Sequence, residues 1–498
     1  MIKAQIGPSS VKTKSRGLRT SQQQQRPKSP SRKGIVSSSL NSPKSIAKEH
    51  VTHNQVCHPA KAATLPNHLV VSTLPPHATG IADFSHITFG SDSRFQVESC
   101  ESTDKPDLER KAKEILAQFT NFDTITIVLG NSAHNALAAY VLRELKGFKS
   151  SRKKIYMHVH DPVLTNFISM MNIFGEDPYE FYFRNRAHLK LSSPKRELFT
   201  EANSWRLYQD HGITGIEYLV NLVSVHGIFM HSEFAISIYK EILHRKMRHV
   251  VPTIQKLYHP CFDDHTFMPP EDRIYDLGIF GVLDNGGKMT DQAIKVFQSL
   301  RKMEASRNCV IAGYNAHEWR AANGQMDLTG CTFINNPSRR ELLEIMKNCK
   351  VGLQPRRAST GESSGIVPML ISANVPTIVS GVGAFTEYPK NIVEPVSNSQ
   401  FSSSAIEAYI RIRKRQSESN SDRDEFLAYS QSNSKISFLD KVSAALDAGL
   451  KQVHIRLSSD KVITSLDPIT IYKLNASCEI EEREWPFTEN NKGHLENC

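Results

Sequence analysis

The eight cysteines of this chain include no Cys-x-x-Cys pair and are scattered from Cys57 to Cys498. That spacing indicates neither a zinc site nor a disulfide framework, and it favours a reducing compartment. No apolar run approaches the roughly 18 residues of a membrane-spanning helix, and no apolar core of a signal peptide is present. We therefore expect a soluble, cytoplasmic protein, and a peripheral contact with a membrane stays open.

Residues 1–50 almost lack acidic side chains, because they hold 11 Lys and Arg but only one carboxylate, Glu49. This segment accounts for the formal net charge of +10, and the rest of the chain is neutral. A neutral body argues against a nucleic-acid partner. The basic segment also lacks apolar periodicity, so we expect disorder up to residue 65. Contact with an anionic membrane surface, a transit peptide and a solvated tail without a partner all stay open for it.

Apolar strands alternate with helices from His68 onward. Strands are expected at 68–73, 124–129, 154–160 and 227–231, followed by a stretch at 251–270 whose four prolines indicate a linker. Further strands are expected at 276–282, 309–313, 331–334 and on both sides of the turn that carries Glu362. Continuous apolar strands favour parallel sheets covered on both faces. The predicted fold class is therefore α/β, with two Rossmann-like βα domains facing across a cleft.

This pattern divides the chain into five predicted segments. They are a disordered basic tail at 1–65, an N-terminal Rossmann-like domain at 66–255, a C-terminal Rossmann-like domain at 256–400, a helical segment at 401–455 and a tail of unknown structure at 456–498. Within them, residues 216–225 are expected to be helical, 416–435 a loop or frayed helix, and 436–450 the last helix. Ser338 and Glu341 form the pattern of a capping box at the start of another helix.

The sequence Gly361-Glu-Ser-Ser-Gly365 lies between two apolar strands and opens a short helix. A helix that starts with such small residues presents free backbone N–H groups, which suit a phosphate. Glu362 would repel a phosphate, so we expect its carboxylate to accept hydrogen bonds from hydroxyl groups on what the phosphate carries. A diphosphate linked to a sugar fits both features.

Two cationic residues are candidates for contact with that diphosphate. Arg356 lies six residues before Glu362 and can reach the same ligand, whereas its neighbour Arg357 is expected to face solvent. Lys288 follows a strand in a Gly-rich loop, where a phosphate contact and a solvated loop lysine are both open interpretations.

The sequence His158-Val-His160-Asp161 ends a strand. Side chains two residues apart share a face, so the two imidazoles could together bind a metal. No other clustered Cys or His supports such a site, and we expect neither a metal nor a cofactor. His160 is expected to face a substrate and His158 to lie in the core. At the end of another strand, capping of a helix by Ser232 is the simpler interpretation of His231-Ser-Glu233.

Five segments in order resemble family 4 (group 1) glycosyltransferases of the bacterial polysaccharide-biosynthesis type. The segments are Pro75-Pro-His-Ala-Thr-Gly-Ile-Ala-Asp-Phe-Ser85, Leu129-Gly-Asn-Ser-Ala-His134, His160-Asp161, His231-Ser-Glu-Phe234, and Arg356 to Pro389 with Gly361-Glu-Ser-Ser-Gly365 and Gly383-Ala-Phe-Thr-Glu-Tyr-Pro389. The resemblance covers roughly residues 68–395. It implies a GT-B fold, an acceptor-side N-terminal domain, a C-terminal nucleotide-sugar-binding domain, and metal-independent transfer with retention.

The resemblance also implies roles for individual residues. His160 and Glu362 would be catalytic, with His160 beside the reacting sugar and Glu362 on the hydroxyls of the donor sugar. The donor-binding residues would be Gly80, Lys288, Arg356, Ser363, Ser364, Gly365 and Ile366. Asp83, His134 and Asp161 would lie on the acceptor side. The sequence departs from the family at Leu370, where many members have a second Glu that binds the ribose, and at Val282, where an Arg is common.

The leading hypothesis is a glycosyltransferase that moves a sugar from a nucleotide-sugar donor to a glycan or lipid-linked acceptor. A GT-B sugar-nucleotide epimerase, which needs no acceptor, is an alternative within the enzymes. A catalytically silent GT-B domain that acts as a binding or scaffold protein is the alternative from another class.

Overall fold

The computed structural model describes residues 67–448, except for positions 78, 103, 147, 149–151, 172–176, 184–194, 201–203, 216–224, 247–251, 263–265, 358, 360 and 419–421. The tails predicted at 1–65 and 456–498, and most of the helix predicted at 216–225, lie outside the described residues. Within the described part of the chain, no helix is long and apolar enough to cross a membrane.

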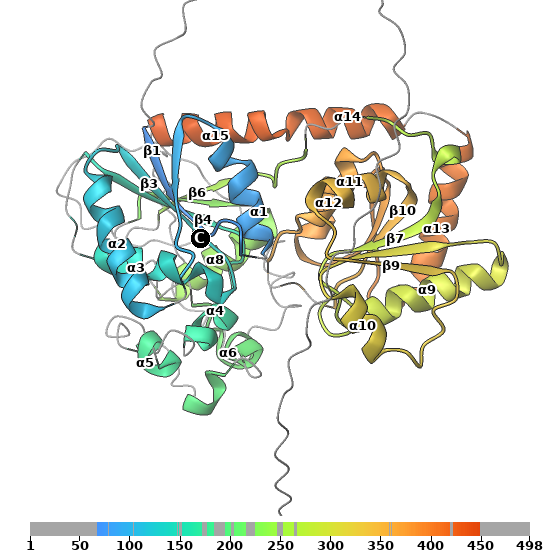
Figure 1. Cartoon of the computed structure of the whole chain (residues 1–498), viewed down its shortest axis with the longest axis horizontal. Helices are drawn as coiled ribbons and strands as arrows, with labels where there is room; N and C mark the ends of the chain where they lie inside the picture. The colour runs from blue at the N-terminus through green and yellow to red at the C-terminus, as the bar shows by residue number, and fades with distance from the viewer. Residues whose placement is uncertain are drawn as a thin grey trace, which may run out of the picture. The chain divides into compact units, whose positions relative to one another are not determined.

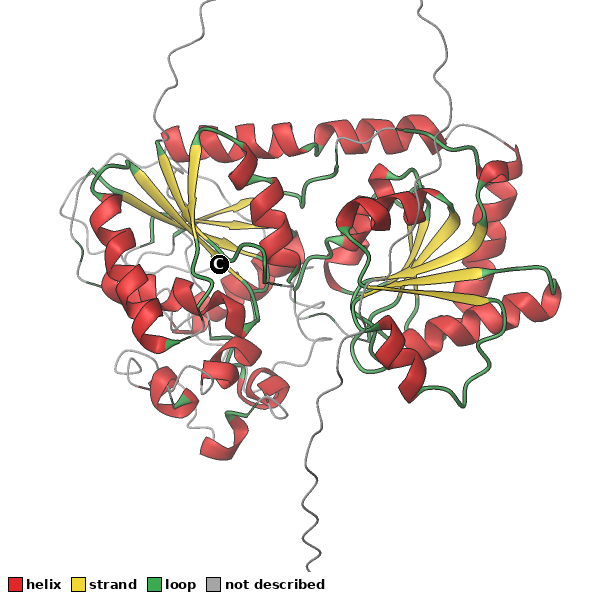
Figure 2. Cartoon of the chain, in the orientation of Figure 1, coloured by secondary structure: helices red, strands yellow, loops and turns green. Residues whose placement is uncertain are grey.

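Two parallel sheets of six strands each form the framework of the fold (Figure 2). The first sheet has the order β2-β1-β3-β4-β5-β6, with β1 (His68–Val71), β2 (Phe95–Glu98), β3 (Thr124–Leu129), β4 (Lys154–Val159), β5 (Gly227–Met230) and β6 (Thr253–Lys256). The second has the order β12-β11-β10-β7-β8-β9, with β7 (Tyr275–Phe280), β8 (Cys309–Gly313), β9 (Cys331–Asn335), β10 (Cys349–Gln354), β11 (Thr377–Ser380) and β12 (Val393–Val396). The predicted pair of Rossmann-like sheets is therefore confirmed.

Helices cover both faces of the first sheet (Figure 1), because successive strand residues point to opposite faces. Leu69 and Val71 belong to a core cluster with α2 (Lys105–Phe119), α3 (Ala136–Glu144) and α8 (Glu233–Lys246), and Val70 belongs to a second cluster with α1 (Gly80–Ile87) and α15 (Lys435–Ala448). Shorter helices follow β4, namely α4 (Thr165–Ser169), α5 (Pro178–Phe183) and α6 (Ser204–His211). The first sheet thus obtains part of its cover from the last helix in the described chain.

The second sheet is also covered on both faces. α9 (Thr290–Met303) and α13 (Phe401–Glu418) share one apolar cluster, and α11 (Arg339–Lys347) and α12 (Ile366–Ser372) share another. α10 (Ala316–Ala322) follows β8, and α14 (Asp422–Ser432) places Phe426 beside Val367 and Ile371 of α12. The predicted capping box is present, since Ser338 Oγ accepts from the backbone N–H of Glu341, and Glu341 accepts from that of Ser338.

Two expectations about local structure are wrong in part. The Pro-rich stretch at 251–270 contains β6, an edge strand of only four residues whose apolar signal is hidden between Pro252 and Pro260. The stretch at 416–435 contains the end of α13 and the whole of α14, so of the two expected alternatives, a loop or a frayed helix, the loop is wrong. α14 has few apolar residues, so its sequence lacks the periodicity by which a surface helix is recognised.

The strand orders place particular loops where ligands bind in such sheets. The direction of chain progression reverses between β1 and β3 in the first sheet, and between β7 and β10 in the second. Open α/β sheets bind ligands outside the carboxyl ends of the strands at this switch point. The loops after β7 and β10 carry Lys288, Arg356 and Glu362.

Candidate functional site

The turn at 361–365 connects β10 to α12. Gly361 has φ +93°, and a Cβ there would lie 2.4 Å from Cγ of Pro162, so the turn requires glycine at this position. Ser364 is buried, and its Oγ accepts from the backbone N–H of Ile366 (3.3 Å). α12 has only seven residues after its N-cap, Gly365. A helix this short has a weak dipole, so the case for an anion depends on nearby side chains.

Arg356 supplies a buried positive charge beside this turn. Its side chain is 8% exposed, and its Nε has no hydrogen-bond partner among the described residues. The backbone N–H of Arg356 donates to Ser380 Oγ (2.8 Å) at the end of β11, which fixes the loop. Burial lowers the pKa of Arg356, and the carboxylates of Glu362, Asp284 and Asp161 oppose that shift. Arg356 thus places a positive charge away from water, and its Nε–H group is available to donate a hydrogen bond to a ligand.

Lys288 supplies a second cation from the loop after β7. Its backbone N–H donates to Asp284 Oδ1 (3.1 Å), which shapes this Gly-rich loop. Burial and, next, the charge of Arg356 lower the pKa of Lys288 to about 7, against the opposing effect of Glu362 and Asp284. An anion bound between Lys288 and Arg356 would offset both the burial of these groups and the repulsion between them. It would replace hydration that each group has lost and would attract both charges.

Asp161 approaches these groups from the end of β4. Its Oδ2 accepts from the backbone N–H of Asn131 (2.8 Å), which follows β3. Burial raises the pKa of Asp161 to about 6, and Glu362 adds to this shift, whereas Lys288 and Arg356 oppose it. The structure therefore brings Asp161 of the first sheet together with Lys288, Arg356 and Glu362 of the second.

Glu362 is half-buried, and its carboxylate is held by the preceding loop. Ser359 Oγ donates to Glu362 Oε2 (3.2 Å) and accepts from the backbone N–H of Gly361 (3.1 Å). Ser363, the next residue of the turn, lines a narrow cavity of about 10 Å³. The other residues around this cavity are His231, Tyr258, His259, Ala384, Glu387 and Tyr388.

His160 belongs to a separate, buried group of histidines. Leu257 offers a carbonyl, which can only accept, so His231 Nδ1 donates to it (2.9 Å) and Nε2 of the neutral ring is an acceptor. His160 Nδ1 (3.1 Å) and His158 Nε2 (3.2 Å) both lie within hydrogen-bond distance of that His231 Nε2, whose single lone pair accepts from one of them at a time. Burial lowers the pKa of His231 to about 4 and those of the other two well below the usual range. His160 is 6% exposed beneath Phe84, with ring centroids 4.4 Å apart.

The same three histidines are the group among the described residues that could hold a metal ion. Each offers one nitrogen, and these nitrogens lie within 4.8 Å of one another. Neutral imidazoles are the form that binds metals. Hydrogen bonds already join these nitrogens, however, and none of the groups that shift their pKa values is a carboxylate. The absence of a metal stays a prediction.

The remaining predicted residues lie around these two groups. Asp83 Oδ2 lies 4.0 Å from an Nη of Arg339, and His134 is exposed with its ring 5.0 Å from that of His77. Gly80 is the exposed first residue of α1, and a Cβ there would meet nothing within 4 Å. The close approach of α1 occurs instead at Gly130, where a Cβ would lie 1.8 Å from Cδ1 of Ile81. The roles predicted for all of these residues stay predictions.

Sequence patterns missed several residues that take part in this arrangement. Asp284 accepts from the backbone N–H of Lys288, Ser359 Oγ donates to Glu362, and His231 Nε2 lies within hydrogen-bond distance of two other histidines. His231 ends a strand, which was a usable signal. Nothing local distinguishes Ser359 from other loop serines. Arg357 is exposed as expected and donates to the carbonyl oxygens of Gly286 and Asn285.

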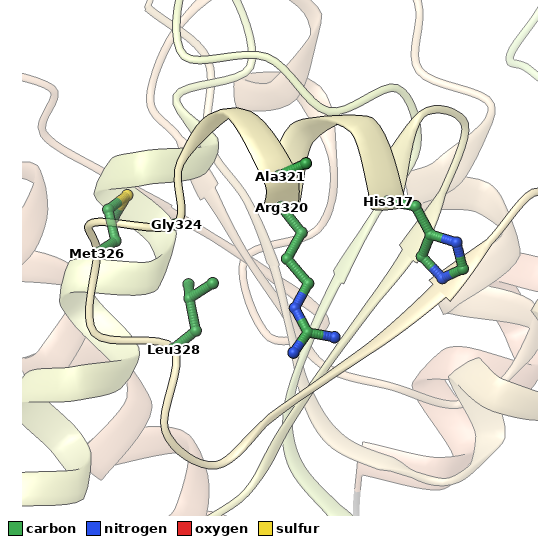
Figure 3. Close-up of a pocket in the computed structure, with 6 residues that line it drawn as sticks. All are labelled: His317, Arg320, Ala321, Gly324, Met326 and Leu328. Atoms are coloured by element: carbon green, nitrogen blue, oxygen red, sulfur yellow. The ribbon is translucent and has the colours of Figure 1, made fainter.

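A larger surface pocket, of about 600 Å³, lies elsewhere in the second half of the chain (Figure 3). Figure 3 shows His317 and Arg320 extending from α10, with Met326 and Leu328 on the loop that follows it. None of the residues predicted for the site lines this pocket. We therefore assign the candidate site to the carboxyl ends of β7, β10 and β4.

Comparison with known proteins supports the fold. No family model matches the chain, and no curated protein matches it in sequence. A solved structure of trehalose-6-phosphate synthase, from a study of glycosyltransfer with retention, has a TM-score of 0.50 at 11% identity and aligns over 77% of this chain and 99% of that chain. Pneumococcal O-GlcNAc transferase GtfA, in complex with UDP and GlcNAc, has a TM-score of 0.44 at 14% identity over 69% of this chain. This chain spans about 60% of the GtfA chain. The alignment with the synthase and the two parallel sheets show the GT-B fold, as the resemblance predicted.

Proposed function

We propose that this chain transfers a sugar from a nucleotide-sugar donor to a glycan or lipid-linked acceptor, with retention and without a metal. The observation that carries this proposal is the pair of cationic side chains at the switch point of the second sheet, the half-buried Lys288 and the buried Arg356, beside the carboxylate of Glu362. Two such cations suit a diphosphate, and an adjacent carboxylate suits the hydroxyl groups of a sugar. The GT-B fold and the trehalose-6-phosphate synthase likeness support the same reaction class.

The proposed chemistry needs charge stabilisation on the departing diphosphate. Lys288 and Arg356 would provide it, and electrostatic stabilisation is stronger where a charge is shielded from water, as at the buried Arg356. Glu362 would hold the donor sugar through its hydroxyl groups, and Asp161 would face the acceptor side. His160 would act only after Phe84 uncovers it, since its ring is buried in this structure. Residues 1–50 lie outside the described part, and their contact with anionic lipid is proposed on charge alone.

A catalytically silent binding protein is the second candidate, and Leu370 favours it. Many family members have a ribose-binding Glu at this position, as the resemblance implies, but Leu370 is fully buried in the apolar core beside β10. Val282, at the other departure, is exposed and neutral. The ribose would therefore need other partners, whereas Lys288, Arg356 and Glu362 would still be available to the diphosphate and the sugar.

The first test is ligand-induced stabilisation of the full chain by UDP, GDP, ADP and their sugars. Ligand at a hundredfold excess over its dissociation constant stabilises the folded state by about 2.7 kcal/mol. We expect one nucleotide family to raise the melting temperature of the wild type and of Arg357→Ala, but not that of Arg356→Ala. Arg357→Ala is the matched control, because it removes the same charge from an exposed neighbour. The absence of any shift in the wild type would favour the silent binding protein.

A further inference from the structure

Glu387, a carboxylate from the second half of the chain, caps a helix of the first. It ends the 3-10 turn η8 (Gly383–Glu387), which follows β11. Its two carboxylate oxygens accept from the backbone N–H groups of Glu233 (2.9 Å) and Phe234 (2.8 Å), at the start of α8. α8 has fourteen residues, and a negative charge is favourable at this end of a helix. The contact is therefore a specific, doubly hydrogen-bonded one.

The other end of η8 lies directly against the loop that holds Glu362. Gly383 has φ +57°, and a Cβ there would lie 2.2 Å from Oγ of Ser359 and 3.4 Å from Cδ1 of Phe234. Only glycine therefore fits between Ser359 and α8. Since Ser359 Oγ donates to Glu362 (3.2 Å), a displacement of η8 would free or push the hydroxyl that holds this carboxylate.

The turn at 361–365 also lies against α8 at a point that does not involve η8. A Cβ at Gly361 would lie 3.2 Å from Cδ1 of Ile238 in α8. α8 thus packs against the turn at 361–365 through Ile238. It also binds η8, the segment next to Ser359, through its first backbone N–H groups. The positions of the turn at 361–365 and of η8 are therefore both set by the same helix, α8.

We propose that Glu387 is a positioning residue for Glu362. Its bond to the start of α8 fixes η8 against Ser359, and Ser359 then sets the direction of the Glu362 carboxylate toward the donor sugar. The effect on the sugar rests on the proposed function, whereas the positioning of the loop does not.

Hydrogen exchange of the full chain without ligand tests the positioning. In Glu387→Ala we expect the amides of Glu233 and Phe234, and those of residues 361–366, to exchange about tenfold faster than in the wild type. Glu233→Gln is the matched control, because the Glu233 side chain is 62% exposed and pairs with Lys256 (3.0 Å) at the same helix end. Unchanged exchange at 361–366 in Glu387→Ala, or equal acceleration in Glu233→Gln, would overturn the proposal.

Ligand binding then separates positioning from a general loss of structure. The probes are UDP and UDP-glucose, or the matching pair if the panel identifies another nucleotide. In Glu387→Ala we expect affinity for the diphosphate within about twofold of the wild type, and affinity for the sugar nucleotide to fall by about fivefold or more. Glu387→Gln, which keeps one acceptor, should recover part of the loss. Equal weakening of both probes would overturn the proposal. Wild type that binds neither probe would instead refute the proposed function, and hydrogen exchange would still decide the positioning.

Discussion

At the scale of single residues, the proposed donor-binding role of Lys288 would link binding to pH. Burial, followed by the charge of Arg356, holds its pKa at about 7, and a bound diphosphate would raise that pKa by stabilising the ammonium. Because the protonated form would bind the diphosphate more tightly, we expect the affinity to be highest below pH 7 and to fall as the pH rises through 7. We expect the affinity for a nucleotide sugar to fall about tenfold between pH 6 and pH 8.5, with proton uptake on binding. Calorimetry in two buffers of different ionisation enthalpy measures both.

Lys288→Arg is the control for that profile, since an arginine keeps its charge over this range. The variant should lose the decline above pH 7 and keep a smaller one near pH 6, where Asp161 ionises and begins to repel the diphosphate. A wild-type affinity that rises with pH would contradict the assignment of Lys288 to the diphosphate.

Asp161 also predicts a pH dependence of folding stability. Burial is the main cause that raises its folded pKa to about 6, above the ordinary value of 3.8. A raised pKa favours the folded state at low pH, and this contribution is lost as the pH rises toward and through 6. Asp161→Asn does not titrate, so its stability relative to the wild type should increase by about 1 to 2 kcal/mol between pH 5 and pH 8. Urea denaturation at the two pH values checks this, and a constant difference would count against the shift.

At the scale of elements, the ends of β7 and β8 approach too closely for a side chain. A Cβ at Gly313 would lie 1.8 Å from the carbonyl oxygen of Gly281, a backbone atom that cannot rotate away. Gly313→Ala should therefore cost about 3 kcal/mol of stability and displace the loop that leads to Lys288. Gly80→Ala is the contrast, because its Cβ meets open space and alanine stabilises a helical position by about 0.4 to 1 kcal/mol. Denaturation midpoints of the two variants should move in opposite directions.

The elements that could be predicted from sequence are those with a strong local pattern. β3 (Thr124–Leu129) and β8 (Cys309–Gly313) have the predicted bounds because each is a continuous apolar run buried on both faces. β2 (Phe95–Glu98) was missed because it is an edge strand with only Phe95 buried. β6 was missed because the prolines around it gave the stronger signal. A half-buried edge strand of four residues has too few buried apolar positions for its sequence to indicate a strand.

The same reasoning explains which parts of the site could be foreseen. Lys288 and Glu362 follow β7 and β10, which are neighbours at a switch point, so their proximity follows from chain order and strand ends. The position of Asp161 beside them depends on packing between segments that are distant in the sequence. The same holds for the bond of Glu387 to α8, which joins residues more than 150 positions apart. No local pattern encodes such a contact.

At the scale of the whole molecule, the chain returns to the first sheet after it completes the second. Phe438 of α15 is 2% exposed and belongs to the same apolar cluster as Val70 and Phe84, far earlier in the chain. Arg94 also pairs with Asp440 of α15 (2.9 Å), at an exposed position. The first sheet therefore depends for part of its core on a helix that lies beyond every strand of the second.

This arrangement predicts that a substitution in α15 destabilises the first sheet. Phe438→Ala should cost about 3 to 5 kcal/mol, because it removes a buried ring and leaves a cavity against Phe84. Ile436→Ala lies two residues away in the same helix but is 61% exposed, so it should change stability by less than about 0.5 kcal/mol. Hydrogen exchange should show the loss from Phe438→Ala in β1 and β4, with less effect in β7 and β8. If only α15 itself exchanged faster, the helix would be an appendage rather than part of that core, and the first sheet would hold together without it.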